Sequence, residues 1–132
     1  MYFDHEKLIV YQKPLKFIEL IDPILKRFKY HINVLMHLDE ASTSISLNIS
    51  EGTGKFTSKD KCKFFDIARG SALECASARD ILIRKKKISE EEYNEGKKIL
   101  HEIVSILIGL IKSNSDRIYE NEISYSSLEE NR

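Results

Sequence analysis

The chain has 132 residues, of which 21 are Lys or Arg and 21 are Asp or Glu, so its formal net charge is zero. This balance excludes a uniformly basic nucleic-acid binder of the histone kind. Five Gly and two Pro are too few for a turn-rich β-fold, and 42% of the residues are hydrophobic. Length and composition therefore predict one soluble, all-α domain, a bundle of helices.

The sequence shows no targeting or membrane-spanning segment. Residues 1–10 contain Asp4, Glu6 and Lys7 and lack the apolar core of a signal peptide. The longest uncharged apolar run, residues 103–111, is far shorter than the roughly 20 residues that cross a bilayer. We expect a cytoplasmic protein that does not contact a membrane.

The first expected helix covers residues 12–30, where apolar side chains recur at three-and-four spacing. Pro14 suits its first turn, whereas Pro23 lacks a backbone donor and should kink or split the helix. The second expected helix covers residues 34–51, and Gly52 is a candidate left-handed cap at its end.

The third expected helix covers residues 58–86, with Thr57 or Ser58 as its N-cap. The fourth begins at Ser89, where Ser89 and Glu92 have the spacing of a capping box. Its apolar pattern decays after about residue 112. We therefore expect a four-helix bundle over residues 1–112, followed by a frayed helix end and an acidic tail over residues 113–132.

That tail carries five acids and two bases, which leaves 19 bases against 16 acids in residues 1–112. The two parts of the chain therefore have opposite net charges.

The last two expected helices carry more apolar surface than one bundle core requires. Each has a second apolar stripe beside its first, and a helix that is apolar on two sides is buried on two sides. The simplest second partner is another subunit. The residues expected at this oligomer interface are Phe65, Ala72, Ala76, Ile83, Ile99 and Ile106.

The sequence offers no constellation of catalytic or metal-binding residues. No His follows an acid at the spacing of a di-iron bundle, and the Gly52–Lys55 turn lacks the Walker pattern. Cys62 and Cys75 fall on one expected helix about 20 Å apart, so we expect free thiols. We expect no enzymatic activity, no metal site and no cofactor.

Basic residues concentrate in one segment. Residues 55–87 contain ten bases and four acids, and the bases gather at both ends of the third expected helix. One interpretation is an ordinary solvated surface, because Arg84 follows Asp80 at ion-pair spacing and cations favour helix C-termini. The other is nucleic-acid contact, which an oligomer would reinforce. The candidates are Lys55, Lys59, Lys61, Lys63, Arg84, Lys85, Lys86 and Lys87.

Three stretches carry a family resemblance: LDEASTSISLNISEG at 38–52, GKFTSKD at 54–60 and FFDIARGSALEC at 64–75. They resemble the bacterial 23S rRNA intervening-sequence protein family, over about residues 4–120. The resemblance implies an antiparallel up-down four-helix bundle that assembles as a ring-like homopentamer. It also implies kinship with the accessory variability determinant of diversity-generating retroelements, a basic pentamer that partners a reverse transcriptase and binds nucleic acid.

The sequence thus favours a non-catalytic, homo-oligomeric scaffold that binds RNA, single-stranded DNA or an RNA-handling protein such as a reverse transcriptase. A scaffold that binds only proteins is the alternative.

Overall fold

The protein is described by a computed structural model that covers the backbone of residues 1–28 and 33–130 and the side chains of residues 1–28 and 33–116. A short 3-10 helix, η1 (Asp4–Lys7), precedes four α-helices. These are α1 (Ile9–Arg27), α2 (Asn33–Thr53), α3 (Ser58–Arg84) and α4 (Glu90–Glu130). The described residues contain no strand, so the prediction of an all-α fold is confirmed.

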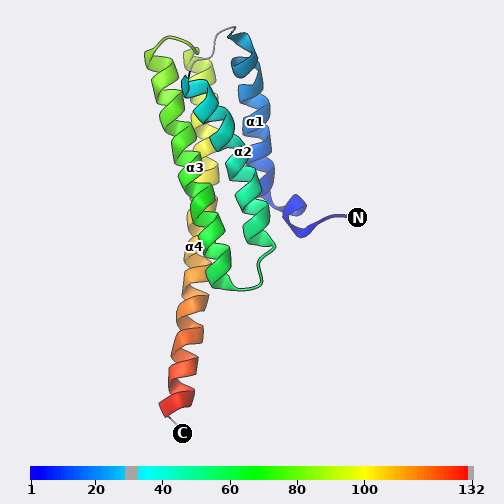
Figure 1. The fold of residues 1–132 in the computed structure, drawn as a ribbon, viewed down its shortest axis with the longest axis vertical. Coiled ribbons are helices and arrows are strands. Elements are labelled where there is room, and N and C mark those ends of the chain that lie inside the picture. Colours follow the sequence, from blue (N-terminus) through cyan, green and yellow to red (C-terminus); the bar gives the residue numbers. More distant parts are fainter. Residues whose placement is uncertain (29–32, 131–132) are drawn as a thin grey trace.

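The four helices lie side by side around one core (Figure 1). α2 packs against α1 and α3, and α4 packs against α1 and α3, so each helix has two neighbours. Phe17, Leu38, Ile45, Leu82 and Leu107 are among the fully buried side chains at the centre. The amphipathic spacing of the sequence thus produces a four-helix bundle with a single continuous core.

α1 is one continuous helix, so Pro23 does not split it, which was one of the two outcomes expected. The helix begins at Ile9, so Pro14 lies inside it rather than in its first turn, and Pro23 is also internal. Each proline removes one backbone donor, and packing of the buried face compensates for that loss. Residues 29–30, the expected end of this helix, lie outside the described residues.

Gly52 does not have the role predicted for it. α2 continues to Thr53, and no described glycine has a positive φ. A Cβ atom built on Gly52 would lie 2.8 Å from Cε1 of Phe65. Gly52 therefore allows α2 and α3 to approach closely, which corrects its assignment as a left-handed cap.

α4 begins as predicted and continues further than predicted. Ser89 Oγ accepts a hydrogen bond from the Glu92 amide (3.1 Å), and Glu92 Oε1 accepts one from the Ser89 amide (3.0 Å), which confirms the capping box. The helix runs to Glu130 and projects beyond the other three helices (Figure 1). Residues 113–130, expected to fray, are a helical extension, consistent with their lack of Gly and Pro.

Candidate nucleic-acid interface

The predicted basic residues occupy opposite ends of α3. Lys55, Lys59, Lys61 and Lys63 lie at its start and Arg84–Lys87 at its end. A helix of 27 residues separates the two groups by about 40 Å. Within one chain they therefore form two surfaces rather than one.

The first surface, which we call the α2–α3 end, comprises Lys55, Phe56, Lys59, Lys63 and Phe64. Its backbone is set by Thr57, whose side chain accepts a hydrogen bond from the Asp60 amide at 3.1 Å and so starts α3. The turn before it presents Phe56, which is fully exposed. An exposed aromatic side chain among lysines is a feature of surfaces that stack nucleic-acid bases.

The lysines of the α2–α3 end surround a second aromatic ring. Lys55 Nζ lies 4.9 Å and Lys63 Nζ 5.9 Å from the centroid of the Phe64 ring. Lys55 also pairs with Glu51 at 3.6 Å, whereas Lys59 and Lys63 are exposed. The α2–α3 end thus combines ammonium groups for phosphates with aromatic faces for bases. The charge pattern of the sequence indicates these lysines but not the exposed Phe56, although an aromatic residue stands between Lys55 and Lys59 in the chain.

Lys61 has a different role from the other predicted lysines. Its ammonium donates to the carbonyl of Thr53 at 2.8 Å and reaches the carbonyl of Gly52 at 3.4 Å. These are carbonyls at the C-terminal end of α2, where a positive charge is stabilising. Lys61 therefore closes the end of α2, and its charge is already engaged within the chain.

The second surface, which we call the α3–α4 end, comprises Arg84, Lys85, Lys86 and Lys87, all of them exposed. The amide of Lys87 donates to Leu82 O and that of Lys86 to Ile83 O, the pattern of a Schellman motif. Lys86 accordingly has a positive φ of 58°. The turn thus displays four cations in succession.

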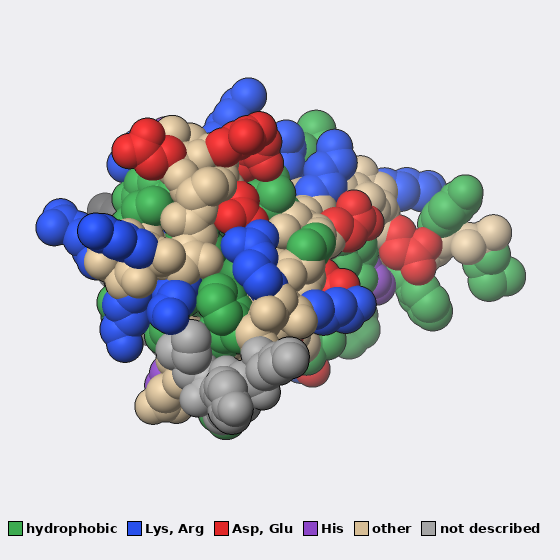
Figure 2. Space-filling model, turned by 90° about the horizontal axis from the view of Figure 1, so that it is seen from above, with side chains coloured by type: hydrophobic (Ala, Val, Ile, Leu, Met, Phe, Trp, Pro, Cys, Tyr) green, Lys and Arg blue, Asp and Glu red, His purple; other side chains and the backbone are tan. Residues whose placement is uncertain are grey.

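Acidic residues lie close to the α3–α4 end. Glu90 and Glu91, the first two residues of α4, are exposed. One of the four cations also has a contact within the chain, because Lys87 Nζ lies 5.9 Å from the centroid of the Phe28 ring. Seen from this end of the bundle, Lys and Arg side chains stand around the rim with Asp and Glu side chains between some of them (Figure 2). The α3–α4 end is therefore less uniformly positive than its sequence suggested.

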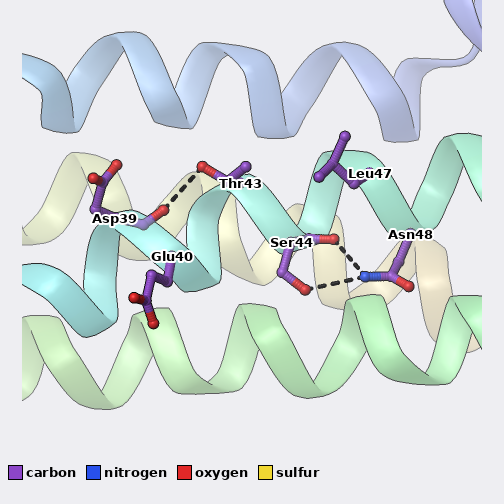
Figure 3. Close-up of a pocket in the computed structure, with 6 residues that line it drawn as sticks. All are labelled: Asp39, Glu40, Thr43, Ser44, Leu47 and Asn48. Carbon is purple, nitrogen blue, oxygen red and sulfur yellow. Dashed lines mark hydrogen bonds between the residues drawn. The ribbon is translucent and has the colours of Figure 1, made fainter.

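A shallow groove on α2 lies in the stretch that carried the family resemblance (Figure 3). Asn48 Nδ2 donates to the carbonyl (2.9 Å) and to Oγ (3.0 Å) of Ser44, and Ser44 Oγ lies 2.8 Å from Ser71 Oγ on α3. The first two contacts lie within α2, and the contact between Ser44 and Ser71 joins α2 to α3. The small polar residues of this stretch thus serve helix packing.

Glu51 of α2 and Glu74 of α3 do not form a paired acid–base site, because each contacts a different partner on the surface. Glu51 pairs with Lys55, and Glu74 pairs with His37 at 3.3 Å, both in exposed positions. Among the described residues, no three His, Cys, Asp or Glu side chains are grouped to hold a metal ion. The described helices also include none that is long and apolar enough to cross a membrane.

The predicted oligomer interface is corrected in part. Phe65 and Ala72 are 4% and 0% exposed, so they belong to the core of the single chain and leave no surface for a partner. The two apolar stripes of α3 merge into one broad core face, because α2 and α4 contact the helix from adjacent sides. The remaining four, which are half-buried and packed against the core, are Ala76, Ile83, Ile99 and Ile106.

Other apolar side chains of α3 are exposed instead. Ile67, Leu73 and Ile81 retain 43%, 46% and 45% of their accessible surface. They mark an outer face of α3 that the bundle does not cover.

Comparison with known proteins shows to which family the chain belongs. The profile of the 23S rRNA-intervening sequence protein family matches residues 6–109, which include the bundle and both basic surfaces. The chain belongs to this family. A crystal structure of a protein of unknown function from the S23 ribosomal protein family of Bacteroides thetaiotaomicron is also similar, with 26% identity and a TM-score of 0.73. Among curated proteins, none matches the chain.

The 23S rRNA-intervening sequence protein family accounts for the bundle but not for the whole chain. The structural match covers 99% of the Bacteroides protein and 79% of this chain. The family profile ends at residue 109, before the helical extension of α4. The part of α4 after residue 109 therefore lies outside the residues that the family profile matches.

Proposed function

We propose that this protein is a non-catalytic, homo-oligomeric scaffold, an antiparallel four-helix bundle, that binds RNA through the α2–α3 end. The observation that carries the proposal is the fully exposed Phe56 beside Lys55, with two exposed lysines on the adjoining turns of α3. Phosphate contacts by lysine supply affinity, and base stacking on aromatic rings favours single-stranded segments.

The family supports RNA as the first ligand to test, because its description refers to 23S rRNA intervening sequences. Assembly would repeat the α2–α3 end once per subunit and so raise the avidity for a folded RNA. Five subunits is the number that the family resemblance implies.

The test is a fluorescence anisotropy titration of the purified protein with a structured RNA and with single-stranded DNA, at several salt concentrations. Because each phosphate contact releases counterions, log affinity should fall linearly with log salt. Replacing Lys59 and Lys63 together by Glu should weaken RNA binding at least tenfold and flatten that slope. Lys16→Glu changes an exposed lysine on α1 and is the matched control.

Phe56→Ala separates stacking from charge. Loss of one stacked base costs about 1–3 kcal/mol, roughly a 5- to 150-fold change in affinity, with little change in the salt slope. Unchanged RNA affinity in both Phe56→Ala and the Lys59 and Lys63 double variant would overturn the proposal for this end. Arg84→Glu with Lys86→Glu then tests the α3–α4 end.

A scaffold that binds an RNA-handling protein is the second candidate. The observation that favours it is the uncovered outer face of α3, with Ile67, Leu73 and Ile81 half-exposed. Affinity capture with and without nuclease separates the two functions. Recovery of one protein partner, unchanged by nuclease, would favour this candidate over direct RNA binding.

A further inference from the structure

A basic, apolar-floored groove runs between α3 and α4, on a side of the bundle that neither basic end includes. Its volume is about 190 Å³, and Ala76, Leu100 and Val104 contribute to its floor. Lys97 and His101 of α4 line it and are exposed. None of the residues lining it is acidic.

Arg79 of α3 lines the same groove and is 3% exposed. Its Nη2 is buried and has no hydrogen-bond partner among the described residues. The guanidinium stacks on Tyr93, with Cζ 4.6 Å from the ring centroid. A buried cation is costly unless a carboxylate or a comparable acceptor pairs with it.

The surroundings of Arg79 accommodate the guanidinium without neutralising it. A Cβ atom on Gly96 would lie 2.5 Å from Arg79 Nε, so a glycine at this position leaves room for the side chain. The adjacent carboxylate, Asp80, accepts a hydrogen bond from the Tyr93 hydroxyl at 2.7 Å. Burial lowers the pKa of Arg79, as expected of a cation that lacks a full counter-charge.

The chain itself contains a segment of matching chemistry. Residues 113–130 form the part of α4 that projects beyond the bundle (Figure 1), and residues 113–132 carry five acids against two bases. In the sequence of this segment, Ile118, Glu122 and Tyr125 follow one another at intervals of four and three residues, the spacing of neighbours on a helix.

A chain cannot place this segment in its own groove. Val104, at the groove, and Ile118 lie on the same continuous helix, about 21 Å apart along its axis. The extension therefore reaches only the groove of another molecule. Each chain offers one groove and one extension, so the stoichiometry is matched.

We propose that the groove between α3 and α4 receives the acidic extension of α4 from a second copy of the chain, with a carboxylate of that copy beside Arg79 and Lys97. The contact rests on the homo-oligomer of the proposed function and supplies an interface for it. Apolar residues of the extension cover Ala76 and Val104, which are partly exposed in the single chain.

Binding of the isolated segment tests the proposal directly. The ligand is a fluorescein-labelled peptide of residues 113–132, and a scrambled peptide of the same composition is its control. The acceptor is the full chain with its own extension neutralised, so that its groove is vacant. Its substitutions are Asp116→Asn, Glu120→Gln, Glu122→Gln, Glu129→Gln and Glu130→Gln. We expect saturable binding of the native peptide and at least tenfold weaker binding of the scrambled one.

Two neighbouring lysines give the matched pair of acceptor variants. Lys97→Glu reverses a charge in the groove and should weaken peptide binding at least tenfold. Lys98→Glu changes an exposed lysine that does not line the groove and should alter it less than twofold. Absence of peptide binding, or equal losses in the two variants, would overturn the proposal.

Light scattering measures whether the oligomer depends on this contact. The mean masses of the native chain, Lys97→Glu and Lys98→Glu are compared. If the contact contributes to assembly, Lys97→Glu lowers the mean mass at micromolar concentration and Lys98→Glu does not. If Lys97→Glu forms an oligomer of unchanged mass and the peptide does not bind, the proposed contact between groove and extension is wrong, but the homo-oligomer itself is not contradicted. RNA affinity of Lys97→Glu, measured in parallel, shows independently whether the proposed function stands.

Discussion

At the scale of single residues, two glycines of the bundle have opposite surroundings. A Cβ atom on Gly52 would lie within 2.9 Å of two ring carbons of Phe65, whereas a Cβ atom on Gly70 would meet nothing within 4 Å. Both glycines are helical, so a methyl group at either position also removes the entropic cost of glycine in a helix. The two positions differ only in the contacts that an added methyl group would make.

This difference predicts opposite effects of the same substitution. Gly52→Ala should destabilise the protein by about 1–3 kcal/mol, because overpacking forces α2 and α3 apart. Gly70→Ala should stabilise it by about 0.5–1 kcal/mol through helix propensity. Urea unfolding followed by circular dichroism measures both values. A Gly52→Ala variant as stable as the native chain would contradict the close approach of these helices.

The two cysteines differ in a way that chemistry can detect. Cys75 is fully buried, and burial raises the pKa of its thiol from 9.0 to about 12. Cys62 is half-exposed, and its thiol lies 3.5 Å from the carbonyl of Ile111. Because the thiolate is the reactive species, Cys75 should be inert in the folded protein.

A thiol-reactive chromogenic disulfide should therefore label one thiol per chain at pH 8 and two after denaturation. Cys62→Ser should abolish the labelling of the folded protein, and Cys75→Ser should leave it unchanged. Rapid labelling of Cys75 in folded Cys62→Ser would mean that the core opens readily at α3.

At the scale of the helices, the start of α4 also holds the end of α1. The Glu92 carboxylate accepts hydrogen bonds from the Ser89 amide and from Arg27, whose Nη1 lies 3.2 Å from Oε1. These contacts, with Arg27 the largest cause, hold the pKa of Glu92 below its ordinary value of 4.5. One side chain thus caps α4 and connects it to the end of α1.

Because the pKa of Glu92 is lower in the folded protein, its contribution to the stability of the fold depends on pH in a direction that can be predicted. Its stabilising contribution is fully present above pH 4.5 and is lost as the pH falls through the lower pKa of the folded state. Glu92→Gln should cost about 0.5–1 kcal/mol at pH 7 and progressively less below pH 4.5. Glu91→Gln, at an exposed neighbouring position, is the control. Equal pH profiles of Glu92→Gln and the native protein would contradict the ion pair.

Helix positions were predictable where local chemistry decides them. The capping box at Ser89 and Glu92, and the Thr57 cap of α3, depend on side chains within one turn of the backbone they bind. Gly52 was misjudged, and Pro23 does not split α1, because tertiary packing, which a local pattern does not contain, outweighs their usual preferences. The role of Lys61 was missed for the same reason, since its acceptors belong to the preceding helix.

The candidate interface was predictable in its charges and not in its geometry. Counting bases located both ends of α3, but only the folded chain separates the engaged Lys61 from the exposed Lys59 and Lys63. Periodicity likewise recognised that α3 has two apolar sides. It could not distinguish a second subunit from a second helix of the same chain, as the burial of Phe65 and Ala72 demonstrates.

At the scale of the whole molecule, acidic residues adjoin the basic residues at both ends of the bundle. The extension of α4 leaves the bundle at the α2–α3 end, where Cys62 of α3 lies 3.7 Å from Ser115 of α4. The first acids of the extension, Asp116 and Glu120, thus follow directly beyond the lysines proposed to hold RNA. At the other end, Glu90 and Glu91 stand beside Arg84–Lys87.

This arrangement predicts which acids oppose RNA binding. If RNA contacts the α2–α3 end, Asp116→Asn with Glu120→Gln should raise the affinity for an RNA short enough to contact one subunit about two- to fivefold at 50 mM salt, because repulsion of phosphates is removed. At 1 M salt, where charges are screened within about 3 Å, the difference should vanish. Glu90→Gln with Glu91→Gln removes two acids at the opposite end and should leave the affinity within error of the native value. The reverse result, a gain in the Glu90 and Glu91 variant alone, would move the RNA contact to the α3–α4 end.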